Sequence, residues 1–321
     1  MRRYPDFTAV SGLPGGAAVT IGNFDGVHLG HQALLRRVGD FAATQGLASV
    51  VLTFEPHPVR VLAPALAPPL ITRLDEKLRL LAAHGVEAAV VQPFDRDFAA
   101  LSPTAFVERV LVDALGVRAL VVGHDFTYGA RRGGTTETLR AAGEQHGFTV
   151  EVVSAQAVGS GLVASSSKVR EFVLEGRMDG AALVLGRPFS LVGTVVAGAQ
   201  RGRLLGFPTA NLAPESELLP RTGVYAGWLD WDGALRPAVV NVGHNPTFVE
   251  ASGRPGVEVH VIGAAGLDLY DRRCRLWFAE RLREERRFDG VDALVAQIGR
   301  DRDEAAALLA TRAAPAPVLL P

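Results

Sequence analysis

A glycine-rich turn between an apolar run and a helical pattern constrains the fold of this 321-residue chain more than any other feature. Residues 17–21 have the length and apolar character of a buried strand, residues 22–31 contain three glycines, and a helical pattern begins near Gln32. A strand–turn–helix unit of this kind points backbone N–H groups and the positive end of a helix dipole into one concavity. The turn therefore predicts a site for a phosphate group.

Two histidines, His28 and His31, lie in this turn at a spacing that puts both imidazoles on one side of a first helical turn. Taken alone, such a pair can simply cap a helix or lie on the surface. A zinc site would need further ligands, and the lone cysteine, Cys274, is far away in the sequence. The glycines and the preceding strand favour phosphate binding, a pattern that resembles the signature of adenylyl-transferring nucleotidyltransferases.

Composition limits the class of protein. Hydrophobic residues make up 48% of the chain, enough for packed cores, and the length suits two domains. The formal net charge of -1 argues against a protein built mainly to bind nucleic acid or an anionic membrane surface. A single cysteine excludes an internal disulfide framework and fits a reducing compartment. We find no apolar signal-peptide core and no apolar run that could span a bilayer, so we expect a cytoplasmic protein.

The first half of the chain alternates strand-like and helix-like segments. The expected strands are residues 17–21, 48–53, 88–91, 119–122 and 149–153, and the expected helices are residues 32–45, 75–84, 103–115 and 136–146. This alternation predicts a Rossmann-like α/β domain with a parallel sheet covered by helices on both faces. In such folds ligands bind at the carboxyl ends of the strands.

Two loops that follow expected strands carry aromatic residues. Residues 53–58 combine Phe54 and His57 with two prolines, and residues 123–129 combine two aromatics with flanking glycines. Side chains of this kind can hold a planar ring. From local sequence alone, a rigid connector and a solvated loop remain alternatives.

A second candidate anion site lies at residues 165–170, Ser-Ser-Ser-Lys-Val-Arg, which lead into a helical run. Serine hydroxyls at a helix start commonly cap backbone N–H groups, which accounts for one of the three serines. The neighbouring Lys168 and Arg170 are not explained by capping. Hydroxyls, N–H groups and cations together suit a leaving pyrophosphate.

These four motifs, in this order and spacing, resemble the adenylyltransferase module of the prokaryotic FAD synthetases, a family that combines riboflavin kinase with FMN adenylyltransferase. The resemblance implies that the ATP phosphates contact Gly22, Asn23, Phe24, His28, Gly30, His31, Ser165, Ser166 and Arg170. It implies that the flavin lies near Phe54, Pro56, His57, Asp125, Phe126 and Tyr128.

The second half of the chain changes character. Candidate strands at residues 191–197, 224–231, 238–242, 257–262 and 274–279 follow one another without long helices, which predicts a small antiparallel β-barrel closed by a helix near residues 291–309. The resemblance to the FAD synthetases implies that the domain at 1–185 is the adenylyltransferase and the domain at 186–312 the kinase, and we expect a frayed tail at 313–321. The sign-alternating segment 281–287 is expected to be a solvated surface.

The chemistry of the second half centres on residues 202–211, which contain Pro-Thr-Ala-Asn. Glycines there let the backbone approach phosphates, and an ordinary turn is the alternative. The Thr209 hydroxyl and the Asn211 amide oxygen are ligands that a magnesium ion accepts.

Together with residues 186–189, residues 241–248 and Glu258, this motif resembles the riboflavin kinase module, of which Pro-Thr-Ala-Asn is the hallmark. The resemblance implies that phosphate lies against Gly202, Gly206 and Pro208. It also implies that Glu258 is the general base that takes a proton from the riboflavin 5′-hydroxyl. An exposed strand glutamate is the alternative.

The function expected from the sequence is synthesis of both flavin cofactors. Riboflavin is phosphorylated by ATP with Mg²⁺ to give FMN, and FMN is adenylylated by a second ATP to give FAD and pyrophosphate. We expect a monomer or weak homo-oligomer with no nucleic-acid partner. Two other interpretations are a nucleotidyltransferase that acts on another phosphate ester, and a non-catalytic flavin-binding regulator with one inactive module.

Overall fold

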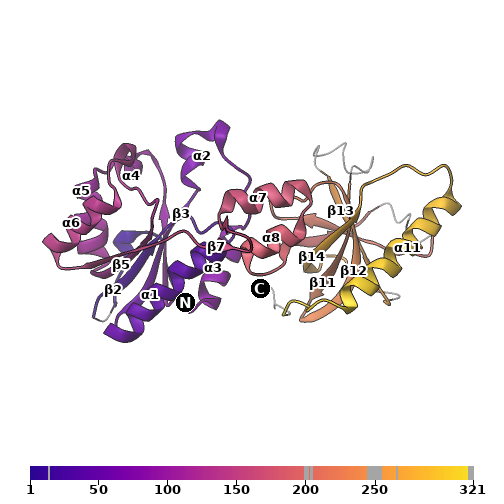
Figure 1. Ribbon diagram of the computed structural model, residues 1–321, viewed down its shortest axis with the longest axis horizontal. Helices are drawn as coiled ribbons and strands as arrows, with labels where there is room; N and C mark the ends of the chain where they lie inside the picture. The colour runs from indigo at the N-terminus through magenta and orange to yellow at the C-terminus, as the bar shows by residue number, and fades with distance from the viewer. Residues whose placement is uncertain (14, 199–201, 203–204, 244–254, 265–266, 317–321) are drawn as a thin grey trace. The chain divides into compact units, whose positions relative to one another are not determined.

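The computed structural model describes residues 1–13, 15–198, 202, 205–243, 255–264 and 267–316 (Figure 1). Contacts between residues divide the chain into two compact units, Met1–Ser165 and Ser166–Pro321. The boundary expected between the two functional domains, at residues 185 and 186, stays a prediction.

The first unit contains a six-stranded sheet in which every neighbouring pair is parallel. From edge to edge its strands are β1 (Arg2–Tyr4), β4 (Ala88–Pro93), β3 (Ala48–Glu55), β2 (Ala17–Ile21), β5 (Val117–Gly123) and β6 (Thr149–Val153). The chain runs outward from β2 through β3 to β4, and later returns to the other side of β2 for β5 and β6. This confirms the predicted Rossmann-like class and puts the topological switch point between β2 and β5.

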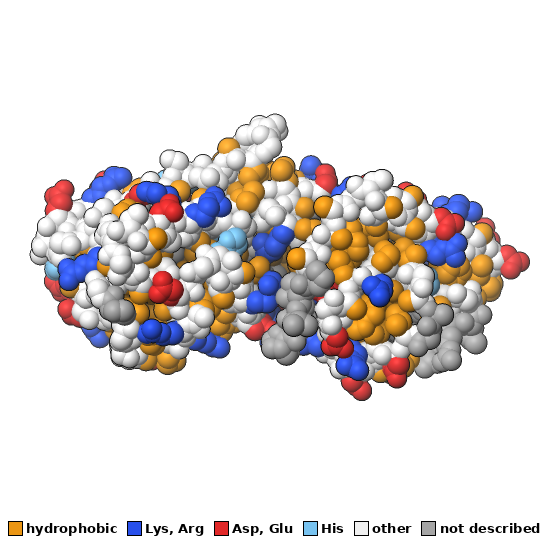
Figure 2. All heavy atoms as spheres, turned by 90° about the horizontal axis from the view of Figure 1, so that it is seen from below, with side chains coloured by type: hydrophobic (Ala, Val, Ile, Leu, Met, Phe, Trp, Pro, Cys, Tyr) orange, Lys and Arg blue, Asp and Glu red, His pale blue; other side chains and the backbone are white. Residues whose placement is uncertain are grey.

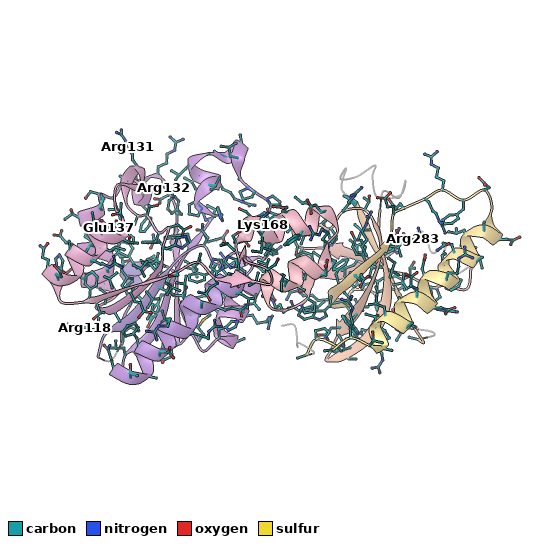
Figure 3. The ribbon with its side chains drawn as sticks, viewed as in Figure 1. Arg118, Arg131, Arg132, Glu137, Lys168 and Arg283 are labelled. Carbon is teal, nitrogen blue, oxygen red and sulfur yellow. The ribbon has the colours of Figure 1, made fainter. Side chains whose placement is uncertain are left out.

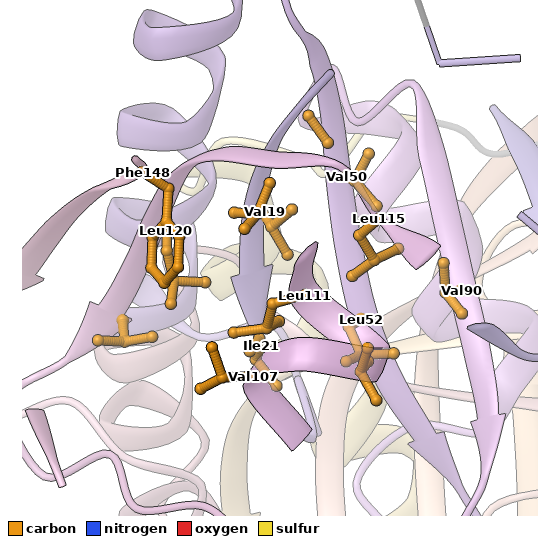
Figure 4. Close-up of a cluster of buried hydrophobic side chains, with 14 of the residues drawn as sticks. Val19, Ile21, Val50, Leu52, Val90, Val107, Leu111, Leu115, Leu120 and Phe148 are labelled. Carbon is orange, nitrogen blue, oxygen red and sulfur yellow. The ribbon is translucent and has the colours of Figure 1, made fainter. Parts of the chain in front are cut away.

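Helices cover both faces of this sheet, as predicted (Figure 1). Helices α1 (Leu29–Gln45) and α3 (Leu74–Ala83) cover one face, while α5 (Pro103–Ala105), the π-helix η3 (Phe106–Ala114) and α6 (Thr136–His146) cover the other. Successive β2 residues face opposite sides: Ala18 belongs to the core beneath α1, and Val19 packs in the core with Leu111 of η3 (Figure 4).

The remaining elements of the first unit are short. They are η1 (Phe7–Ala9), α2 (Pro58–Leu62), η2 (Pro64–Leu66), α4 (Arg96–Ala99), η4 (Ala130–Arg132), β7 (Ala157–Val158) and β8 (Leu162–Val163). Helix α2 and η2 follow β3, so they lie at the carboxyl edge of the sheet where ligands are expected.

The second unit is a closed antiparallel barrel with strand order β10-β13-β12-β11-β14-β9. Its strands are β9 (Phe189–Val196), β10 (Ala210–Pro214), β11 (Gly223–Trp231), β12 (Ala234–Gly243), β13 (Gly256–Val261) and β14 (Arg273–Arg283). Helices α7 (Ser166–Glu175) and α8 (Met178–Leu185) precede it, and α11 (Val291–Ala310) follows. The predicted barrel and closing helix are confirmed, whereas β10, which begins inside the Pro-Thr-Ala-Asn motif, is a strand that the periodicity did not predict.

Helix α11 covers part of the outer face of the barrel. Trp228, Val239 and Trp277 point outward from the strands and pack with Ala305 and Leu309 of the helix. Residues at alternate positions point into the barrel, so each strand here is buried on both sides. The strands covered by α11 therefore carry apolar side chains on both faces, one toward the barrel interior and one toward the helix.

An ion pair joins β14 to α11. Arg283 donates from Nε and Nη2 to the carboxylate of Asp301 at 2.9 and 2.7 Å, and Gln297 Nε2 donates to the same carboxylate at 2.7 Å. Asp301 is only 2% exposed. The expectation that residues 281–287 form a solvated surface is therefore wrong at Arg283, which Figure 3 labels beside α11. Its partner lies 18 residues further along the chain, where no local pattern could reveal it.

Charged side chains of both signs are interspersed on the face shown in Figure 2. Among the described residues, no helix combines the length and the apolar character needed to cross a bilayer. The expected cytoplasmic location and oligomeric state stay predictions.

Replacing Asp301 with Asn should destabilise the barrel, because the half-buried guanidinium of Arg283 loses its charged acceptor. We expect the free energy of unfolding to fall by roughly 1.5–3 kcal/mol. Tryptophan fluorescence during urea denaturation reports this unit selectively, since Trp228 and Trp277 lie on β11 and β14 and Trp231 ends β11.

The matched control is Asp303→Asn on the same helix. The Asp303 side chain is 70% exposed and pairs with its neighbour Arg302, so its loss should change stability by less than about 0.5 kcal/mol. Equal effects of the two substitutions would show that burial of the Arg283–Asp301 pair contributes nothing.

Candidate active sites

The turn after β2 holds two side chains in backbone conformations that L-residues rarely adopt. Phe24 has φ 49° and Val27 has φ 42°, and both side chains are fully buried. For a β-branched residue such as Val27 this conformation costs about 1–3 kcal/mol, so it persists only where surrounding contacts enforce it. Strain of this kind, at the carboxyl end of the central strand, is characteristic of a functional turn.

The Asp25 carboxylate supplies one of those contacts. It is 1% exposed and accepts hydrogen bonds from Ile71 N at 3.1 Å, Thr72 N at 2.9 Å and Thr72 Oγ1 at 3.2 Å. Gly26 N in turn donates to Thr72 Oγ1 at 3.1 Å. The turn is thus attached to the segment that leads into α3. The sequence motifs did not predict a role for Asp25, although an acid within a glycine-rich apolar turn was an available signal.

The structure brings His28 and His31 together at the N-terminus of α1. Their rings stack with centroids 3.7 Å apart and an interplanar angle of 26°. His28 is the N-cap, and its Nδ1 accepts from His31 N at 3.4 Å. An accepting Nδ1 leaves the hydrogen of a neutral ring on Nε2, where it can be donated to an anion. Gly30 permits this arrangement, since a Cβ there would lie 3.0 Å from His28 Nδ1.

His31 has an unusual electrostatic environment. Burial lowers the pKa of His31 well below its usual value of 6.5, and electrostatic interaction with His28 and Lys77 lowers it further. Its Nδ1 is buried and has no hydrogen-bond partner among the described residues. Lys77 of α3 is 4% exposed; burial lowers the pKa of its ammonium, while Asp25 and Glu55 oppose that shift. The site therefore combines a neutral imidazole with a buried cation that sequence reasoning missed.

Asn23 and the expected second phosphate motif lie on different elements. Asn23 is half-buried, and its carbonyl oxygen accepts from Thr53 Oγ1 at 3.3 Å, which ties the turn to β3. Ser165 is the last residue of the first unit, Ser166 is the first residue of α7, and Arg170 lies about one turn later. The boundary between the units thus falls inside this motif.

The aromatic residues expected near the flavin form part of a continuous ring cluster. Phe54, at the end of β3, contacts Phe98 with centroids 5.9 Å apart, and Phe126 stacks on Tyr128 at 6.0 Å and 13°. Tyr128 is only 7% exposed and its hydroxyl lies 3.1 Å from Thr138 Oγ1. Tyr128 is thus a core residue that supports Phe126.

The other residues expected near the flavin lie in loops at the same edge of the sheet. His57 caps α2, with its Nδ1 accepting from Val59 N at 3.3 Å. Pro56 and Asp125 are exposed, after β3 and β5 respectively. The sequence did not predict this capping role, which uses Nδ1 of the His57 ring.

In the barrel, strand register brings Glu258 and Asn211 together. Glu258 of β13 is paired with Asn211 of β10 on one side and with Asn241 of β12 on the other. Directly opposed residues of antiparallel strands share a face, with Cβ atoms about 4.5–5.5 Å apart. Two amide side chains therefore flank the carboxylate on the outer face of the barrel.

Glycines allow the backbone to approach these side chains. Asn211 is 7% exposed, and a Cβ at Gly198 would collide with its amide group. Thr209 precedes β10, and a Cβ at Gly202 would lie 3.3 Å from its hydroxyl oxygen.

The turn between these residues is closed by Phe207 N, which donates to Gly202 O at 2.9 Å. Gly206 and Pro208 are exposed on this turn. Residues 203–204 of the turn and residues 244–248 of the second kinase motif lie outside the described residues.

The oxygen-bearing side chains of this region fit a hard cation. The described part of the chain contains no group of three His, Cys, Asp or Glu that could hold a metal by itself. Thr209, Asn211 and Glu258 nevertheless present a hydroxyl, an amide and a carboxylate around one end of the β10–β13 pair. Magnesium commonly takes few protein ligands and completes its shell with phosphate oxygens and water.

Each half of the chain matches the model of a known protein family. Residues 12–167 match the family model of FAD synthetase, and residues 185–309 match that of riboflavin kinase. The chain is thus a two-module transferase that joins an FAD-synthetase-type sheet to a riboflavin-kinase-type barrel.

The bifunctional riboflavin kinase/FMN adenylyltransferase of Pseudomonas fluorescens is 42% identical over 299 residues, which cover 93% of this chain and 94% of that protein. The protein of the same name from Escherichia coli K12 is 41% identical over 89% of this chain and 90% of that protein. The chain therefore belongs to the family of bifunctional riboflavin kinase/FMN adenylyltransferases.

A solved structure is similar over almost the whole chain. It is described as a macrolide-efflux protein from Streptococcus pneumoniae, with a TM-score of 0.83, 29% identity, and coverage of 95% of this chain and 98% of that one. From the family and both modules, the chain is an enzyme that phosphorylates riboflavin to FMN and adenylylates FMN to FAD, with ATP as the other substrate.

The stability of the first unit should depend on pH through His31. The folded chain holds His31 neutral below pH 6.5, where the unfolded chain binds a proton, so the unfolded state gains protons as the pH falls. The stabilisation is complete above pH 6.5 and is lost below it, at up to about 1.4 kcal/mol per pH unit.

Hydrogen exchange of the β2 and β3 amides at pH 7 and pH 5, corrected for intrinsic rates, measures this loss. His31→Gln should reduce the pH dependence, whereas the control His146→Gln, on α6, should leave it unchanged. An unaltered pH dependence in His31→Gln would mean that another group is responsible.

Proposed function

We propose that adenylylation takes place at the N-terminus of α1, at the switch point between β2 and β5. The FMN phosphate attacks the α-phosphorus of ATP and pyrophosphate leaves. The observation that carries this assignment is the stacking of His28 and His31 at the N-terminus of α1, with burial lowering the pKa of His31 so that its ring is held neutral. Donors aimed at the developing charge, with the helix dipole behind them, stabilise the transition state without a covalent intermediate.

The other residues of this site would contact the two substrates. The ATP phosphates would lie against Gly22, Asn23, Phe24 and Gly30, with Ser165, Ser166 and Arg170 serving the leaving pyrophosphate. The flavin would be bordered by Phe54, Pro56, His57, Asp125 and Phe126, with Tyr128 acting through Phe126. The buried Tyr128 ring supports that indirect role.

For the kinase reaction we assign Glu258 as the general base. It would take the proton from the riboflavin 5′-hydroxyl as that oxygen attacks the γ-phosphorus of ATP. The paired positions of Asn211 and Asn241 on either side of Glu258 support this role. Gly202, Gly206 and Pro208 would lie against the phosphates, where the exposed turn leaves room for them.

Magnesium would be held by the Thr209 hydroxyl and the Asn211 amide oxygen. When bound, the ion would neutralise charge on the ATP phosphates during transfer. The close approach of Gly202 to Thr209 and of Gly198 to Asn211 supports this assignment, because backbone packed against these two side chains restricts their movement.

The functional modules would extend over 1–185 and 186–312, with a tail at 313–321. The matched ranges 12–167 and 185–309 support these limits. A cytoplasmic location and a monomer or weak homo-oligomer that binds riboflavin, FMN and ATP, but no nucleic acid, complete the proposal.

Replacing His28 with Ala should separate the two activities. We expect kcat for FAD formation to fall roughly 10²–10³-fold, because a donor to the transition-state charge is lost. FMN should then accumulate from riboflavin, since Glu258 and the barrel are untouched. Chromatography of the flavins over time measures both steps, and His146→Ala serves as control. Equal loss of FMN formation would refute the assignment of His28 to one reaction.

Replacing Thr209 with Val should do the reverse. Valine keeps the shape and removes the hydroxyl, so we expect FMN formation to fall at least about 10²-fold and its Mg²⁺ requirement to rise. Thr209→Ser keeps the hydroxyl and should retain most activity. FAD formation from supplied FMN should persist in both variants. Similar kinase activity in Thr209→Val and Thr209→Ser would rule out the hydroxyl as a ligand.

A further inference from the structure

His260 makes a hydrogen bond that joins β13 to the turn before β10. Its Nδ1 lies 2.9 Å from the carbonyl oxygen of Pro208. A carbonyl oxygen can only accept, so the hydrogen in this bond must be on Nδ1. His260 lies two residues after Glu258 on β13, and alternate strand residues share a face. The bond therefore ties the strand that carries the proposed base to the segment that leads into Thr209.

The regular ladder does not reach Thr209. The β10–β13 register ends at Ala210 opposite Val259, and Thr209 lies just beyond it. Before Thr209 comes Pro208, which has no N–H and can be attached through its backbone only at its carbonyl group. The next position on β13 is His260, whose side chain contacts that carbonyl group. The side chain of His260 therefore supplies a hydrogen bond between the two segments just beyond the last paired residues of β10 and β13.

The imidazole is also held on another side. Its ring makes an edge contact with Phe207, with centroids 5.5 Å apart and an interplanar angle of 72°. The guanidinium of Arg302, on α11, lies 5.8 Å from the centroid of the same Phe207 ring. The His260 ring is therefore packed as well as hydrogen-bonded, which restricts its rotation and makes the Nδ1–H a directed donor.

We propose that His260 is a positioning residue for the riboflavin kinase reaction: its Nδ1–H holds the Pro208 carbonyl group and so sets Thr209 relative to Glu258. This inference rests on the proposed roles of Thr209 and Glu258. Because a displacement of about 1 Å at a reacting centre can cost roughly 10²-fold in rate, the loss of this one bond affects turnover.

Three substitutions of His260 distinguish the effect of its Nδ1–H donor from the effect of its ring contact with Phe207. Asn places an amide N–H close to the position of Nδ1, Gln places it farther out, near that of Nε2, and Phe keeps the ring contact with Phe207 but has no donor. For His260→Phe and His260→Gln we expect kcat for FMN formation to fall about 10–100-fold, with KM for riboflavin changed less than about 2-fold. His260→Asn should restore kcat to within about 3-fold of the parent.

Two measurements on the same samples serve as controls. FAD formation from supplied FMN should be unchanged in all three variants, and tryptophan fluorescence during urea denaturation shows whether the barrel is folded. A purely structural role would lower stability in proportion to kcat and would give no advantage to Asn over Gln. If His260→Phe does not fold, the comparison of Asn with Gln still decides.

The inference is overturned if His260→Phe keeps the parent kcat, or if Asn and Gln lose activity equally. These outcomes are distinct from failure of the proposed metal ligand. If Thr209→Val retains full kinase activity, the role of Thr209 itself is wrong. If Thr209→Val is inactive while His260→Phe is fully active, only the positioning role of His260 fails.

Discussion

The interaction on which the first site depends is the attachment of the buried Asp25 carboxylate to the backbone of Ile71 and Thr72. A carboxylate without water must be satisfied by hydrogen bonds, and the two N–H groups and one hydroxyl provide them. These bonds hold the turn after β2 against the start of α3, and the left-handed conformations of Phe24 and Val27 can persist because the turn cannot relax. The position of the histidine pair follows from this turn.

Both sites lie where regular hydrogen bonding stops. The parallel ladder of β2 ends at Ile21, and the turn that follows carries the histidines at the start of α1. The β10–β13 ladder ends at Ala210, directly after Thr209. The strands fix the backbone on one side of each candidate site, and the segment beyond the ladder is not committed to strand pairing, so its polar groups can be directed toward a ligand. The two units have different folds, but in both the candidate site lies directly beside the end of a strand ladder.

Sequence reasoning succeeded where local pattern decides structure. The strand at residues 17–21 is observed with the predicted limits, because a buried central strand is a short continuous apolar run. It failed where the deciding partner is distant. Strand β10 is short and ends at Pro214, so pairing with β9 and β13, rather than its own periodicity, makes it a strand. The Arg283–Asp301 pair and the attachment of Asp25 to Thr72 likewise depend on contacts between segments that no local window contains.

Closure of the barrel has a consequence for how this protein resists aggregation. Each of its six strands is paired on both sides, so among the described residues this unit offers no row of unpaired N–H and C=O groups to a passing chain. Open edges of the larger sheet occur at β1, which has three residues, and at β6, where Glu151 forms a bidentate pair with Arg37 of α1. A short edge and a charged edge are both poor templates for adding a foreign strand. Protection against fibril-like association is therefore built into the strand arrangement.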